Sequence, residues 1–279
     1  MHLLSRYLPA SLRSAPASAL FGIFVICLYL LVVVLAPVIA PYSETEILGA
    51  AYEPWSSTYW LGTDSLGRDM LSRIIYGARN TVGVALMATV LAFLLGGFMG
   101  LLAATVGGLV DQLLSRTVDV LLAIPSLIFA LLILTIVGTS ATSLILVIAV
   151  LDSTKVFRLA RSVAQTVVVM DYVEAARLRG EGMWYLIRRE ILPNVSAPLI
   201  AEFGLRFCFV FLFISTLSFL GLGAQPPSAD WGSMVRDNAT LIAFGDITPL
   251  LPAGAIALLT IAINFVVDWK LHAASGLHD

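Results

Sequence analysis

Residues 19–40, ALFGIFVICLYLLVVVLAPVIA, form an apolar run without a charged residue. A helix needs about 20 mostly apolar residues to cross a hydrocarbon layer roughly 30 Å thick, because each residue adds about 1.5 Å. Arg6 and Arg13 precede the run, as they would in a secretory signal. The apolar part is too long for such a signal, however, and Pro41 follows the cleavage-like site at Ala40. The run therefore predicts an uncleaved membrane anchor.

The composition of the whole chain indicates the same environment. Of the 279 residues, 59% are hydrophobic and 12% are charged, and the mean hydropathy is +0.95. This is more apolar side chain than a water-soluble core could bury. The further apolar runs are residues 81–106, 120–137, 143–157, 197–222 and 249–267. Because these runs are apolar on all sides, they favour helices over barrel strands. We predict an all-α polytopic membrane protein with six transmembrane helices.

The distribution of Lys and Arg predicts the orientation of these helices. Basic residues near short loops are retained on the cytoplasmic side of a membrane. With a cytoplasmic N-terminus, the inner segments carry Arg6, Arg13, Arg116, Lys155, Arg158, Arg161, Arg177, Arg179, Arg188, Arg189 and Lys270, and the outer segments carry Arg68, Arg73, Arg79 and Arg236. This excess predicts that both termini are cytoplasmic.

The chain is therefore expected to contain one membrane domain with short flanking segments. The expected parts are a cytoplasmic N-terminal segment at 1–18, the anchor at 19–40, a periplasmic loop at 41–80, a core transmembrane domain at 81–268 with a cytoplasmic loop at about 158–195, and a cytoplasmic tail at 269–279.

The cytoplasmic loop contains the charged stretch DYVEAARLRGEGMWYLIRREILPN at residues 171–194. Asp171 is predicted to cap a helix, and Glu174 is placed to complete a capping box. Gly180 and Gly182 then offer positive-φ positions for a sharp turn. The first half of the stretch thus predicts a short helix that ends in a glycine turn.

An apolar stripe follows this turn. Met183, Trp184, Ile187 and Ile191 recur at helical spacing, and Pro193 is expected to end the helix. The whole stretch therefore predicts a bent pair of short helices that cannot span a membrane. From periodicity alone, this pair either contacts a protein or lies passively on lipid headgroups.

Four ordered motifs resemble one family of membrane proteins. EAARLRGEGMWYLIRREILP (174–193) resembles the EAA loop in the membrane subunits of bacterial ABC importers. LGTDSLGRDMLSRIIYGAR (61–79), VDQLLSRTVDVLLAIPSLIFAL (110–131) and LSFLGLGAQPPSADWGSMV (217–235) resemble the dipeptide, oligopeptide and nickel permeases, in particular the second of their two membrane subunits. The resemblance covers residues 20–265 approximately.

The resemblance implies a type I (MetI-like) transmembrane domain in the bacterial inner membrane. It also implies a homologous second permease subunit, two cytoplasmic ATPase subunits and an extracytoplasmic solute-binding protein, with no nucleic-acid partner. The residues implied in ATPase coupling are Glu174, Ala175, Ala176, Gly180, Leu192 and Pro193. The cargo stays open between a peptide, a nickel complex and another small solute.

The sequence itself contains no ATP-binding motif. Its two lysines, Lys155 and Lys270, follow Thr154 and Trp269, so no GxxxxGK[ST] phosphate loop can be written. HExxH and paired CxxC patterns are also absent. We expect a non-enzymatic subunit with no catalytic residue, metal or cofactor of its own. ATP and Mg would be bound by the partner ATPases.

Four residues in or near the apolar runs invite structural predictions. Glu202 and Arg206 are spaced for a local ion pair that faces either the translocation pathway or a neighbouring helix. Pro125 is expected to kink its helix. Trp231 is expected to lie at the membrane surface or beneath a docked binding protein.

An ion-driven secondary transporter is the alternative function. That class typically shows inverted repeats and interrupted helices with charged residues at mid-membrane. No convincing internal repeat is visible in this sequence.

Overall fold

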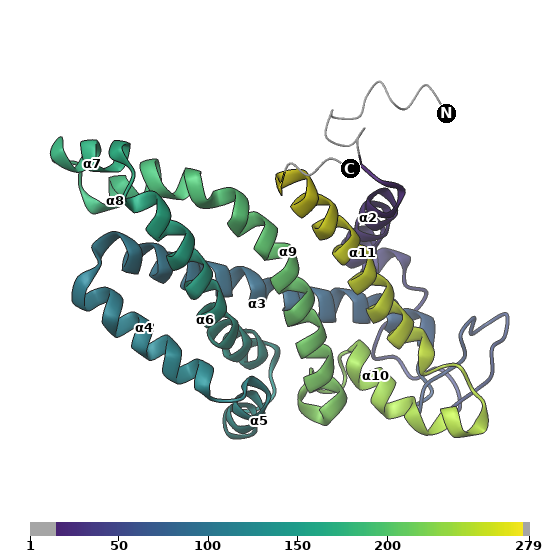
Figure 1. The fold of residues 1–279 in the computed structure, drawn as a ribbon. Helices are drawn as coiled ribbons and strands as arrows, with labels where there is room; N and C mark the ends of the chain where they lie inside the picture. Colours follow the sequence, from purple (N-terminus) through teal and green to yellow (C-terminus); the bar gives the residue numbers. More distant parts are fainter. Residues whose placement is uncertain (1–14, 276–279) are drawn as a thin grey trace, which may run out of the picture. The chain divides into compact units, whose positions relative to one another are not determined.

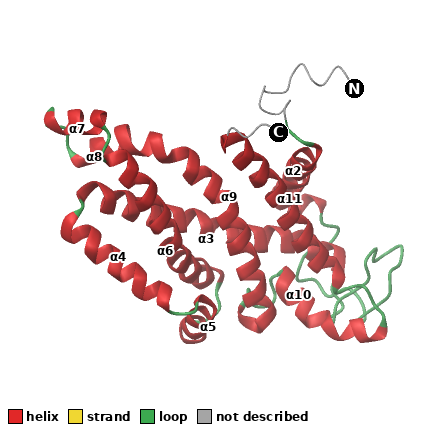
Figure 2. Cartoon of the chain, viewed as in Figure 1, coloured by secondary structure: helices red, strands yellow, loops and turns green. Residues whose placement is uncertain are grey.

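The structure, a computed structural model, describes residues 15–275. Arg6, Arg13 and most of the predicted N-terminal segment lie outside these residues, as do the last four residues of the predicted tail. Helices form the described part, and its only strand-like pairing is an isolated bridge between Thr63 and Asp69 (Figure 2). The predicted all-α class is confirmed for this part of the chain. The chain divides into two compact units.

The first unit contains residues up to 83, residues 218–221 and residues from 226 onward. Its helices are α2 (Ala17–Ile39), the first part of α3 (Met70–Val106), α10 (Trp231–Asn238), the 3-10 helix η4 (Ala239–Phe244) and α11 (Leu250–Ser275). Helices α2 and α11 pack along each other (Figure 1). The contact is close because Gly22 has no side chain: a Cβ there would lie 2.4 Å from the carbonyl oxygen of Ala262. Tyr29 adds a hydrogen bond, donated to the carbonyl of Ala255 at 2.9 Å.

The second unit contains residues 84–217 and 222–225. Its elements are the rest of α3, α4 (Gly108–Ala123), α5 (Ser126–Val137), α6 (Ala141–Val168), α7 (Asp171–Leu178), α8 (Met183–Tyr185), the π-helix η2 (Leu186–Ile191) and α9 (Leu192–Leu217); a π-helix, η3 (Ser218–Leu222), follows α9. Glycines let α3 approach α6. A Cβ would lie 2.2 Å from the Ser153 carbonyl oxygen at Gly96, and 2.7 Å from that of Phe157 at Gly100.

The described residues contain four helices that are long and apolar enough to span a membrane, at Ala17–Ile39, Met70–Val106, Met183–Leu222 and Leu250–His272. The count is five if α4 and α5 together form one broken span. The predicted total of six is therefore not confirmed.

Two of the predicted spans differ from the structure for physical reasons. The run 120–137 is broken between α4 and α5, which meet at 88°, and Pro125 lies at the break. The predicted kink at Pro125 is confirmed, because proline cannot continue the hydrogen bonding of α4. The run 143–157 lies inside the 28-residue α6. Asp152 and Lys155 interrupt the apolar pattern of α6, so this helix does not qualify by composition.

The segment at residues 40–69, before α3, is held by buried charges. The Asp64 carboxylate forms ion pairs with Arg68 at 2.7 Å and with Arg73 at 3.1 Å, and all three side chains are almost fully buried. The carboxylate of Glu44 accepts hydrogen bonds from the Asn80 side chain at 3.0 Å and the Ala229 backbone at 2.7 Å. Residues 70–80, which the sequence placed in the loop, form the start of α3.

Candidate functional site

The charged stretch at 171–194 begins with α7, whose N-terminus differs by one residue from the prediction. Met170 is the N-cap, and no side chain caps the helix. The backbone carbonyl of Met170 accepts from the amides of Val173 at 2.9 Å and Glu174 at 3.2 Å. The predicted Asp171 cap and the capping box with Glu174 are therefore wrong. Both acids lie in the first turn, where the helix dipole favours negative charge.

Helix α7 ends in a glycine turn, as predicted. Only Gly180 of the two predicted glycines has the positive φ of such a turn. Gly180 has a φ of +82°. Its amide donates to the carbonyl of Arg177 at 2.9 Å, and the amide of Glu181 donates to that of Ala176 at 3.2 Å. These two bonds form a Schellman motif, which satisfies the last carbonyls of a helix. Gly182 is extended, with a φ of −73°, so the prediction of a positive φ there is wrong.

Residues 171–191 form a helical hairpin, in which α7 is the first arm and the helix that begins at Met183 is the second. The second arm is not a short helix ended by Pro193. Residues Met183–Leu222 form one helix of 40 residues that includes η2. The amide of Leu192 donates to the carbonyl of Ile187, five residues back, just before Pro193. The wider π turn accommodates a residue that has no N–H, so the helix continues through Pro193. The second arm is thus continuous with an apolar helix long enough to span a membrane.

One face of the hairpin is buried in a small apolar core. This hairpin core consists of Val173 and Ala176 from α7, Leu186, Ile187, Ile191 and Val195 from the second arm, Leu101 from α3, and Ala164 and Val167 from α6. A guanidinium nitrogen of Arg177 also donates to the carbonyl of Thr105 on α3, at 3.2 Å. The core therefore joins α7 to three longer helices of its unit.

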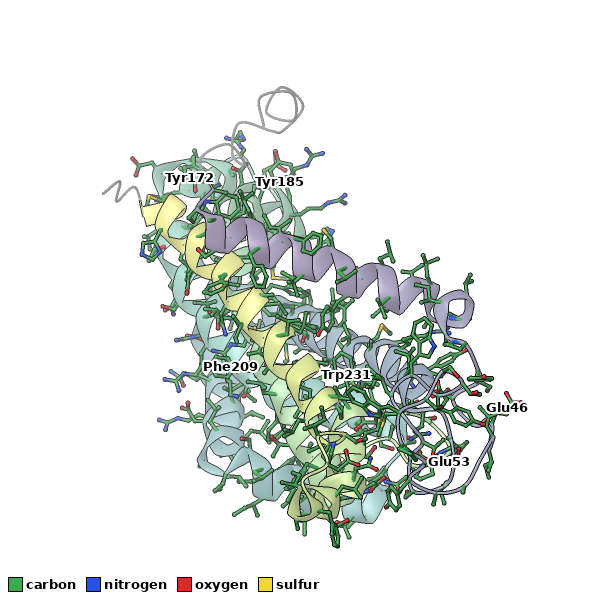
Figure 3. The ribbon with its side chains drawn as sticks, turned by 90° about the vertical axis from the view of Figure 1, so that its right-hand side faces the viewer. Glu46, Glu53, Tyr172, Tyr185, Phe209 and Trp231 are labelled. Atoms are coloured by element: carbon green, nitrogen blue, oxygen red, sulfur yellow. The ribbon has the colours of Figure 1, made fainter. Side chains whose placement is uncertain are left out.

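The opposite face of α7 is open. Leu178 is 84% exposed, and Tyr172 and Ala175 are exposed on the same short helix. Figure 3 shows Tyr172 together with Tyr185 of the second arm at the hairpin end of the unit. The predicted apolar stripe is half correct, because Ile187 and Ile191 are buried whereas Met183 and Trp184 are exposed.

The predicted coupling residues fall on both faces of the hairpin. Ala176 is buried, whereas Glu174, Ala175, Gly180, Leu192 and Pro193 are exposed. The two adjacent alanines thus have different surroundings, although the sequence predicted the same role for both.

The predicted pair of Glu202 and Arg206 is present as an ion pair within α9. The structure adds two partners that sequence reasoning missed. One Asp152 oxygen lies 3.3 Å from the Lys155 ammonium and 3.8 Å from an Arg206 guanidinium nitrogen. The Arg206 guanidinium also lies over the Phe209 ring, 5.4 Å from its centroid. The only sequence signal for this cluster was a carboxylate inside an otherwise apolar run.

Trp231 lies in the interior of the first unit, so the prediction of a surface position is wrong. Its side chain is almost fully buried, its ring nitrogen donates to the carbonyl of Ile74 at 2.9 Å, and its ring meets Tyr29 edge-on. Asp230 caps α10 and accepts from the amide of Ser233 at 3.0 Å and from Thr81 at 3.2 Å. Burial raises the pKa of the Asp230 carboxyl, and these hydrogen bonds oppose the shift.

Comparisons with known proteins agree on one kind of molecule. Residues 96–273 match the family described as "Binding-protein-dependent transport system inner membrane component". The dipeptide transport system permease protein DppC of Alkalihalophilus pseudofirmus is 34% identical and covers 90% of this chain and 83% of that protein. The probable D,D-dipeptide transport system permease protein DdpC of Escherichia coli is 33% identical and covers 92% of this chain and 86% of that protein.

Two further matches widen the comparison. The glutathione transport system permease protein GsiD of Pectobacterium atrosepticum is 32% identical over 76% of this chain and 71% of that protein. A crystal structure of an amino acid ABC transporter with histidines matches in fold, with a TM-score of 0.54 and 20% sequence identity. It covers 71% of this chain and 92% of that one.

Proposed function

This chain belongs to the family of binding-protein-dependent transport system inner membrane components, and we propose that it forms half of the translocation pathway of an ATP-driven importer. It is a multi-pass permease subunit of the inner membrane. The cargo proposed is a peptide or a related small solute, because relatives over most of the chain are named for the transport of dipeptides, D,D-dipeptides and glutathione.

The observation that carries the coupling role is the two-sided construction of α7. Ala176 and Val173 are buried in the hairpin core, whereas Ala175 and Leu178 are exposed on the other side. An exposed apolar side chain beside a small one suits entry into a groove on another protein. In this proposal the groove belongs to a cytoplasmic ATPase subunit.

The continuity of the second arm gives this contact a mechanical consequence. Movement of α7 is transmitted to the helix Met183–Leu222 through a close-packed core, because such interiors deform little. The same core contains residues of α3 and α6. Closure of two ATPases around ATP would then shift these helices together. This shift would change the side of the membrane to which the translocation pathway is open. The partner ATPases supply the bound ATP and Mg, and a solute-binding protein delivers cargo from outside.

Reconstitution tests the proposal against ion-driven transport. Liposomes would contain this chain, a homologous permease partner, the ATPases and the solute-binding protein, and uptake of radiolabelled dialanine would be measured. We expect uptake to require ATP and the ATPases and to persist when ionophores collapse the ion gradients. Uptake driven by an ion gradient in liposomes without the ATPases would contradict the proposal.

A further inference from the structure

An apolar groove lies between α3 and α9 in the second unit, with a volume of about 310 Å³. This α3–α9 groove is lined by Phe93 of α3 and by Leu192, Ser196, Leu199, Ile200 and Phe203 of α9. It is open to the outside of the unit, because Ile200 is 73% exposed. Ser196 is polar, but its hydroxyl donates to the carbonyl of Pro193 at 2.8 Å. The side chains of the lining therefore favour an apolar occupant.

Two aromatic contacts join α3 to the helix Met183–Leu222 along this groove. Phe93 meets Phe203 edge-on, with ring centroids 5.1 Å apart, and Phe98 meets Trp184 edge-on at 6.4 Å. Phe98 and Trp184 are both exposed. Tryptophan is enriched at the level of lipid headgroups, because its ring is apolar and its N–H is polar. Trp184 is therefore suited to the headgroup end of the groove.

Arg188 brings a positive charge to the same side of the helix. It lies between Trp184, which meets Phe98, and Leu192, which lines the groove, and it is four residues from each. Residues four apart share one side of a helix. Arg188 is exposed and forms no salt bridge with any residue of the described range 15–275. Its guanidinium is therefore available to an anion at the end of the groove.

The length of the groove matches one leaflet of a bilayer. Leu192 and Phe203 are eleven residues apart in the sequence, which corresponds to about 16 Å along a helix. The hydrocarbon core of a membrane is about 30 Å thick, so one leaflet is about 15 Å deep. Both α3 and the helix Met183–Leu222 are long and apolar enough to span a membrane. A lipid acyl chain thus matches the groove in chemistry and in length.

We propose that the α3–α9 groove binds one anionic phospholipid, with an acyl chain along the groove and the headgroup phosphate paired with Arg188. A guanidinium binds phosphate through parallel N–H donors, and basic residues at the ends of membrane helices recognise anionic headgroups. Arg189, which is also exposed, adds positive charge beside the site. A zwitterionic lipid has the same chains but no net negative charge. The headgroup is therefore expected to determine which lipid occupies the groove.

The test is photo-crosslinking in phosphatidylcholine nanodiscs that contain the chain with every subunit that co-purifies with it. Trace phosphatidylglycerol or phosphatidylcholine would carry the same diazirine-labelled acyl chain, and mass spectrometry would locate the labelled peptides. We expect phosphatidylglycerol to label residues 192–203 about fivefold more than phosphatidylcholine does, the ratio expected for one arginine near an anionic headgroup. The exposed apolar helix α5 is the internal control, and both lipids should label it equally.

Two pairs of variants separate the headgroup from the chain. Arg188→Gln should reduce phosphatidylglycerol labelling of the groove to the phosphatidylcholine level. Arg116→Gln, which changes an exposed arginine on α4, should retain the preference. Ser196→Phe should lower labelling by both lipids, because the added ring occupies the groove. Thr135→Phe is its control, since the Thr135 hydroxyl also donates to a carbonyl of its own helix and does not line the groove.

Several results would overturn the proposal. Equal labelling of the groove by the two lipids would show that the headgroup is not recognised, and a preference that survives Arg188→Gln or disappears in Arg116→Gln would refute the role of Arg188. Unchanged labelling in Ser196→Phe would place the chain elsewhere. Absence of labelling at residues 192–203 would show that another protein subunit covers the groove. The comparison of two lipids on the unsubstituted protein keeps the test decisive if a variant fails to assemble.

Discussion

The segment at residues 40–69 and the hairpin at residues 171–191 both connect long apolar helices, yet they are built in opposite ways. The 40–69 segment buries charge: Asp64 and Arg68 pair within it, and Arg73 of α3 joins them. The hairpin buries only apolar side chains in its core and leaves Arg179, Arg188 and Arg189 exposed. The 40–69 segment is thus fixed by contacts within its own unit. The hairpin has one packed face and one face available to a partner.

The largest effect is expected from breaking the buried charge network. Asp64→Ala leaves two buried guanidinium groups without their carboxylate, which costs about 3–5 kcal/mol in the free energy of unfolding. Thermal unfolding of the purified protein measures this loss. Asp237→Ala is the control, because it removes a partly exposed pair with Arg236 and should cost at most about 1 kcal/mol. Equal losses in the two variants would contradict the difference in burial.

The next effect separates the two faces of the hairpin. Ala176→Glu places a charge in the hairpin core and should unfold α7 locally, because an unpaired buried charge is strongly destabilising. Ala175→Glu places the same charge on the exposed face and should leave the helix folded. Trypsin cleavage after Arg177 and Arg179 in inside-out vesicles should rise sharply for the first variant only. Similar cleavage of both variants would show that α7 has no buried face.

A smaller effect compares the two glycines of the turn. Gly180→Ala forces a side chain into a φ of +82° and should cost about 1–2 kcal/mol, whereas Gly182→Ala should cost little at a φ of −73°. Neither added Cβ would meet another atom within 4 Å. The difference between the two variants therefore measures the cost of the backbone conformation alone. Amide hydrogen exchange in α7 should be faster in Gly180→Ala by about tenfold. Equal exchange rates in the two variants would contradict the turn geometry.

Local patterns predicted the features that depend on neighbouring residues. The apolar run at 19–40 lies in α2 apart from its last residue, the run at 249–267 lies in α11 apart from its first residue, and the kink at Pro125 is present. Gly180 was recognised because few other residues adopt a positive φ at a helix end. These features need no knowledge of distant parts of the chain.

Features that depend on contacts between residues far apart in the chain were not predicted from the sequence. Trp231 is buried against Tyr29 and Ile74, and Asp152 meets Arg206 from another helix. Periodicity describes one element at a time, so it could not place these partners together. Pro193 was misjudged because the π turn before it depends on packing that the sequence pattern does not reveal. The difference between Ala175 and Ala176 likewise appears only once α7 packs on its neighbours.

The coupling role proposed for this chain requires that the open face of α7 contacts an ATPase. We would test this contact by measuring ATP-driven dialanine uptake by reconstituted complexes that carry Leu178→Glu or Leu109→Glu. The two leucines are 84% and 76% exposed, but Leu109 lies on α4 and is not part of the hairpin. We predict that Leu178→Glu lowers uptake at least about tenfold and reduces the amount of ATPase that co-purifies, whereas Leu109→Glu retains both. Wild-type uptake and ATPase recovery in Leu178→Glu would contradict the claim and leave α7 as a passive surface helix.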